Sequence, residues 1–230
     1  MRRQSQRQRG NSMLEFAVVC AFLVPLFAGT VDVGLLLTKN MQVSNVNREA
    51  AVLLLRSVTD PSSGLDLSLA QNQALLLRAA KGLGLNQAGT YTADSNGKGV
   101  IILSKVIHVG DVECSRGVVP APNGAPPWNS GNCPNYDKYV FAYRIVIANG
   151  GRFSSAFGAP PTAIVGSNGT ISDADIAQNT ADRATNLGAG GAITLNMSTF
   201  ALIAETYADV SAVNLFKIMY VPTLYARNFS

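Results

Sequence analysis

Residues 1–60 begin with a polar stretch and continue into a long apolar block. Residues 1–10 are polar and basic, residues 16–31 contain no charged side chain, and the apolar pattern resumes after Asp32 as far as Leu37. The block from residue 14 to residue 37 is 24 residues long. A helix of that length can cross a hydrocarbon core about 30 Å thick. We therefore predict a transmembrane helix over about residues 14–37.

The helical pattern continues past this block. Beyond Asn40, apolar residues recur at three- and four-residue steps, with polar residues between them, at Val43, Val46, Ala50, Leu53 and Leu54. Pro61 disfavours helix in the residue before it. We predict one helix over residues 11–58, about 70 Å long. Pro25 removes a backbone donor inside it and is expected to kink or locally melt the helix.

The rest of the chain changes from helical to strand-like periodicity. The pattern predicts a second amphipathic helix over residues 67–81, ended by Gly82 and Gly84. Segments rich in β-branched and aromatic residues predict strands over 100–109, 139–149 and 199–210, and a strand or pair of strands over 215–229, broken near Pro222. Residues 172–187 contain a candidate short capped helix. The predicted fold is α+β, a long N-terminal membrane-spanning helix followed by a small domain with an antiparallel sheet.

Charge gives the membrane segment an orientation and argues against nucleic-acid binding. The net charge is +4, and Arg2, Arg3, Arg7 and Arg9 account for all of it. No basic stripe interleaved with aromatic residues follows, as a nucleic-acid surface would need. The positive-inside rule places residues 1–10 in the cytoplasm and the chain after about Asn40 outside. Asp32 is expected to reach water at the outer membrane edge.

The residues after the membrane segment contain no recognisable catalytic or metal site. His108 is the only histidine, without His, Cys or carboxylate neighbours at ligand spacing, and is expected to be an ordinary strand residue. Asp173 and Asp175 lack the later ligands of a calcium loop. Gly82 and Gly84 lack the strand and third glycine of a dinucleotide turn. We predict no catalytic residues, no metal and no cofactor, and a protein that is not an enzyme.

The cysteines fall into two environments. Cys20 lies inside the apolar block and is expected to behave as a small apolar residue. Cys114 and Cys133 flank a proline-rich loop in the exported part. Outside the cytoplasm such a pair most often forms a disulfide, with two free thiols as the alternative.

Two motifs in the first 56 residues carry a family resemblance. Gly10 ends the basic stretch, Glu15 is the fifth residue after it, and Phe16 opens the apolar helix. This arrangement resembles a type IV prepilin. The segment NREAAVLLLR, which contains Arg48, Glu49, Ala50 and Ala51, is similar to an element of the TadE-like pseudopilins of tight-adherence pilus systems. The resemblance implies a leader peptide over 1–10, a long helix over 11–58 and an extracytoplasmic pilin-like α+β domain over 59–230.

The resemblance also implies a role for each N-terminal motif. A prepilin peptidase would cut between Gly10 and Asn11. A carboxylate in a membrane helix is costly, at about 2.5–3.5 kcal/mol for an aspartate at its centre, so Glu15 is expected to meet the new ammonium at Asn11 of a neighbouring subunit in an assembly. The alternative is that Glu15 reaches the lipid headgroups.

The function implied is that of a minor pilin or pseudopilin of an adhesive pilus or secretion pseudopilus. Its partners would be the prepilin peptidase, other pilins and the inner-membrane assembly platform, and it would reside in the inner membrane as a single-pass protein. The alternative function is an unprocessed single-pass anchor that displays a ligand-binding domain. The apolar block ends without the small-residue cleavage site of a secretory signal. Whether residues 1–10 are removed distinguishes the two functions.

Overall fold

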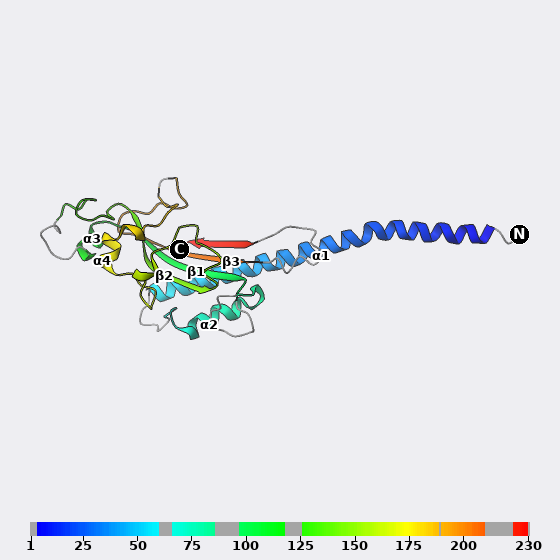
Figure 1. Ribbon diagram of the computed structural model, residues 1–230, viewed down its shortest axis with the longest axis horizontal. Coiled ribbons are helices and arrows are strands. Elements are labelled where there is room, and N and C mark those ends of the chain that lie inside the picture. The colour runs from blue at the N-terminus through cyan, green and yellow to red at the C-terminus, as the bar shows by residue number, and fades with distance from the viewer. Residues whose placement is uncertain are drawn as a thin grey trace.

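One helix dominates the architecture of this chain. The computed structural model describes residues 4–59, 66–85, 97–117, 126–188, 190–209 and 223–229, with the side chains of the first helix described from Ser12 to Val58. Helix α1 spans Gln4–Thr59 and contains 56 residues, which makes it about 84 Å long. Figure 1 shows its first half extending away from the rest of the protein, while its second half lies against the folded domain.

The sheet follows the strand pattern in the sequence closely. Its strands are β1 (Gly99–His108), β2 (Tyr139–Ala148), β3 (Phe200–Ala208) and β4 (Leu224–Phe229). They form one antiparallel sheet in the order β2-β1-β3-β4. The predicted strands over 100–109, 139–149 and 199–210 are thus confirmed to within one or two residues at each end. Part of the predicted strand region 215–229 lies outside the described residues, and its last six residues before Ser230 form β4.

The central strand β1 is buried on both faces because each face of the sheet packs against its own hydrophobic core. On one face, the second half of α1 and helix α2 (Ala70–Ala79) cover the sheet, as Figure 1 shows. The apolar side chains of α1 in this core recur at helical spacing, at Val43, Val46, Ala50 and Leu54. On the other face, the connecting segments and two short helices form a second core around Phe141, Phe157 and Ile176. The predicted α+β class, with a long helix followed by an antiparallel sheet, is confirmed.

Two predicted helices are present with adjusted bounds. Helix α2 is shorter than the predicted 67–81, and a 3-10 turn, η2 (Lys81–Leu83), follows it up to Gly84, which adopts a φ of 65°. That left-handed conformation favours glycine and ends the helical stretch. Helix α4 (Asp173–Gln178) is the predicted capped helix, because the Ser172 side chain accepts a hydrogen bond from the amide of Asp175 at 3.1 Å.

The second core is closed by a disulfide. Cys114 lies on helix α3 (Asp111–Gly117), which the sequence pattern did not predict, and bonds to Cys133 with a Cα–Cα distance of 5.8 Å. Both cysteines are fully buried. The predicted bridge is therefore present in the structure. In the chain-entropy account, closing a loop of this length stabilises the fold by about 3 kcal/mol.

The structure bears on two expectations about α1. The helix continues through Pro25 without a break, so it does not melt there, because a proline removes only one backbone donor. The kink at Pro25 stays a prediction, whereas the expectation for Asp32 was wrong. Asp32 does not reach water. Its side chain is 5% exposed, and neither carboxylate oxygen has a hydrogen-bond partner within the part of the chain that the structure describes.

Candidate assembly surface on the long helix

Within the part of the chain that the structure describes, the first half of α1 is almost entirely exposed. Between Ser12 and Phe27 every side chain is exposed except Cys20, which is partly buried and is a free cysteine. The exposed large residues include Leu14, Phe16, Phe22 and Leu26. By length and composition, the segment Ser12–Val58 of α1 can cross a membrane. Large apolar side chains that stay exposed among the described residues indicate a lipid or protein environment.

The motif residues at the start of α1 lie on this exposed half. Glu15 is exposed, and Phe16 is 71% exposed. Gly10 and Asn11 lie within the helix, but the surroundings of their side chains are outside the described part of the structure. Residue 11 precedes Glu15 by four positions, which is about 6 Å along the axis of α1.

Contact between α1 and the domain begins where the exposed half ends. Ala28 and Asp32 are the first buried positions, and the Lys39 ammonium donates a hydrogen bond to the carbonyl oxygen of Gly82 in the turn after α2. The predicted span 14–37 therefore includes positions that are covered within the protein. That span stays a prediction, since composition and length alone support it.

The second motif lies where α1 crosses the sheet. Ala50 and Ala51 are buried, and their small side chains allow the helix backbone to approach the sheet closely. Just before them, the Asn47 side chain is 2% exposed and reaches both β3 and β4. In the amide orientation that satisfies every partner, its nitrogen donates to the Ala204 carbonyl at 3.0 Å and to the Thr206 hydroxyl at 3.1 Å, and its oxygen accepts from the Asn228 amide at 3.1 Å. Buried polar contacts of this kind fix the position of the helix.

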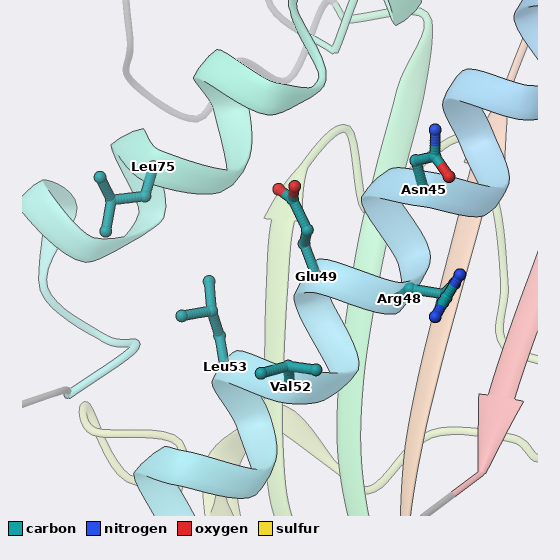
Figure 2. Close-up of a pocket in the computed structure, with 6 residues that line it drawn as sticks. All are labelled: Asn45, Arg48, Glu49, Val52, Leu53 and Leu75. Carbon is teal, nitrogen blue, oxygen red and sulfur yellow. The ribbon is translucent and has the colours of Figure 1, made fainter.

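Arg48 and Glu49, the charged half of the same motif, point away from the sheet. Both are exposed, and neither forms an ion pair with a residue that the structure describes. Figure 2 shows Glu49 directed toward the space between α1 and α2, while Arg48 leaves the helix on a different side. The two residues border a groove of about 550 Å³ whose lining also includes Asn45, Val52, Leu53 and Leu75.

A buried carboxylate on the opposite face of the sheet was not singled out from the sequence. Glu205 on β3 is fully buried and accepts hydrogen bonds from the Ser155 hydroxyl, the Ala156 amide (3.1 Å) and the hydroxyls of Tyr207 (3.2 Å) and Tyr225 (3.1 Å). Burial, followed by the charge of Glu205, raises the pKa of Tyr207 above its ordinary value. A lone acidic residue within an apolar strand run was the available signal. Because its carboxylate is surrounded by donors, we read it as a structural anchor for the segment before Phe157.

The single histidine has defined contacts with its surroundings. His108 lies on β1, where its Nδ1 is 2.8 Å from the Leu195 carbonyl oxygen and its Nε2 is 3.0 Å from Asp137. Its ring also stacks on Tyr139 at a centroid distance of 4.5 Å. In the described ranges, no group of three or more His, Cys, Asp or Glu side chains could hold a metal ion.

Comparison with known proteins places the two motifs in one family segment. Residues 10–52 match the family model described as TadE-like protein. Over these residues the chain is similar to that family. The match begins at Gly10 and ends at Val52, so it includes Glu15, Phe16 and the stretch from Arg48 to Ala51. Searches of curated proteins and of solved structures found no match for the chain.

The matched residues 10–52 all lie within helix α1. The match includes the exposed apolar half of α1. It also includes the part of the second half that contains Asn47 and the groove residues up to Val52. The sheet, the disulfide and the Glu205 network all lie outside the matched residues. The family likeness therefore applies to the helix and to its docking site.

Proposed function

We propose that this chain is a minor pilin or pseudopilin of a tight-adherence type pilus or a related secretion pseudopilus. The observation that carries the proposal is the division of α1 into two unlike halves within one TadE-like segment. The first half is an exposed apolar rod and the second half is fixed on the sheet. In such a subunit, the first half of α1 can be inserted in a membrane and can later pack in a helical assembly. Neither step requires the domain to refold.

The N-terminal motif supports processing before assembly. Gly10 precedes Asn11 at the start of the TadE-like match, and the spacing to Glu15 and Phe16 is that of a prepilin leader. Removal of residues 1–10 would eliminate Arg2, Arg3, Arg7 and Arg9, the charges that hold the N-terminus in the cytoplasm. It would also create an ammonium at Asn11 that can pair with a carboxylate at Glu15 of a neighbour. We propose that prepilin peptidase makes this cut.

The role in assembly is structural. The proposed partners are other pilins, which would pack against the apolar half of α1, and the inner-membrane assembly platform. The proposed location is the inner membrane, with the α+β domain on the outer side.

The function is tested by isolating pili and membranes from cells that carry the pilus genes. The full chain should co-purify with the pilin subunits, and deletion of its gene should reduce the number of assembled pili. A complemented strain is the control. Normal piliation in the deletion strain, together with no co-purification, would contradict the proposal and favour a membrane anchor that displays a ligand-binding domain.

A further inference from the structure

Two adjacent opposite charges on α1 are left without partners in the described structure. Arg48 and Glu49 are both exposed and form no ion pair with any described residue. Neighbouring residues on a helix point in directions about 100° apart, so these two side chains cannot face each other. Because both side chains are exposed, each can reach a charge on another molecule.

The direction midway between these two side chains defines a seam on α1. At about 100° per residue, Met41, Asn45 and Val52 point within about 30° of that direction. All three are exposed, with Met41 at 69% and Val52 at 48%. The buried side chains of α1, such as Val43 and Leu54, lie on the opposite side of the helix. The seam therefore faces outward, and Arg48 and Glu49 border it on its two sides.

Helix α2 forms one wall beside this seam. Leu75 on α2 is 48% exposed and lines the groove together with Val52 and Leu53. Figure 2 shows Leu75 on α2 across the groove from Glu49 and Leu53 on α1. The surface thus combines exposed apolar side chains with one positive and one negative charge. It is complementary to a helix that has the same arrangement, with apolar residues between two opposite charges.

We propose that a second copy of this chain occupies the seam, related to the first by a two-fold axis parallel to α1. Two copies anchored in one membrane have parallel helices. Rotation by 180° about an axis between them places Arg48 of each copy opposite Glu49 of the other, with a height difference of about 1.5 Å. Both ion pairs form at once, because a two-fold interface repeats every contact. The inference rests on membrane insertion of α1 and does not require removal of the leader.

The two kinds of contact have different tasks in this dimer. Val52 and Met41 lie near the axis and meet their own counterparts, while Leu75 borders the neighbouring helix. The apolar contacts provide association, and confinement in a membrane raises the effective concentration of the second copy. The ion pairs set the register and exclude arrangements in which like charges meet.

Charge reversal tests the pairing directly. In membranes that contain two differently tagged copies of the full chain, Arg48→Glu alone and Glu49→Arg alone should each lower co-purification by on the order of tenfold, because both pairs become repulsive. Co-expression of the two single variants should restore it, since every facing pair is then opposite in charge. The double variant Arg48→Glu/Glu49→Arg should also associate as the parent does. Restoration by mixing cannot arise from misfolded variants.

Cross-linking tests the axis independently. In a Cys20→Ser background, Val52→Cys should form an intermolecular disulfide with its own counterpart on mild oxidation. Ser44→Cys is the matched control, because Ser44 is exposed on α1 about a quarter turn from the seam. Equal cross-linking at positions 44 and 52, or single charge reversals that associate as well as the parent, would overturn the proposal. Failure of these tests would leave the pilin function itself untouched, since that function is measured by piliation.

Discussion

The amide of Asn47 on the long helix lies 3.1 Å from the hydroxyl of Thr206 on β3, and both side chains are almost completely buried. This contact joins residues 159 positions apart in the chain. It fixes the height and rotation of α1 on the sheet, because the same amide also reaches Ala204 and Asn228. The rotation in turn determines that Ala50 packs inward while Arg48 and Glu49 face outward.

Replacement of Asn47 should loosen this docking. Asn47→Ala leaves the Ala204 carbonyl, the Thr206 hydroxyl and the Asn228 amide without their buried partner, so we expect a loss of about 1–3 kcal/mol in the free energy of unfolding. Hydrogen exchange of the β3 and β4 amides in the full chain in detergent measures the loss. Asn40→Ala is the matched control, because Asn40 is exposed on the same helix and its replacement should change stability by less than about 0.5 kcal/mol. Equal protection in both variants would show that Asn47 does not hold the helix.

We predict that Asp182 makes the stability of the domain depend on pH. Its carboxylate is fully buried, and both of its oxygens lack a hydrogen-bond partner in the described structure. Burial, and to a lesser extent the charge of Asp175, raises its pKa from 3.8 to about 8. At a pH between 3.8 and about 8, Asp182 is protonated in the folded state and ionised in the unfolded state. The free energy of unfolding therefore falls as the pH rises from about 4 to 8, and this loss is complete above pH 8.

Asp182→Asn removes this titration. The variant should be more stable than the parent at pH 8.5 by about 1–2 kcal/mol, and the two should be nearly equal at pH 4. Thermal unfolding of the full chain in detergent across this pH range measures the difference. Asp173→Asn, at an exposed position of α4, should leave the pH profile unchanged. A parent profile that is flat between pH 4 and 8 would contradict the assignment.

Glu15 should be needed for assembly and dispensable for insertion. Glu15→Gln keeps the shape and a hydrogen-bond acceptor but loses the negative charge, so the protein should insert and lose its leader yet co-purify poorly with pilin subunits. Glu15→Ala should also insert, because an unpaired carboxylate is the costly group in an apolar environment. Assembly of Glu15→Gln at the parental level would favour the headgroup role for this residue.

The sequence predicted the elements of the fold well because their periodicities are strong. β-Branched and aromatic residues located β1, β2 and β3. The uninterrupted apolar block, followed by the three- and four-residue apolar repeat beyond Asn40, located α1. The loop with Cys114 and Cys133 indicated its own disulfide, but the seven residues of α3 are too few for a periodic signal.

Burial of individual polar residues could not be predicted in the same way. Asp32 lies in an apolar stretch and was expected at the surface, whereas its side chain is buried. Asn47 looks like an ordinary polar helix position, and only its rotation toward β3 and β4 reveals its contacts. Glu205 and Asp182 are both buried carboxylates, yet one is surrounded by donors and the other has none in the described structure. These differences depend on which strands and loops meet in three dimensions.

The central claim is that residues 1–10 form a leader that is removed before assembly. Gly10→Val places a bulky side chain where the peptidase must fit the chain closely, so this variant should keep the precursor intact and serve as the unprocessed reference.

The most direct measurement is the intact mass of the full chain extracted from membranes of cells that contain the prepilin peptidase. We predict a mature protein that begins at Asn11, and a precursor that begins at Met1 in the Gly10→Val variant. A parental protein that still carries Met1 or Arg2 in those membranes would contradict the account.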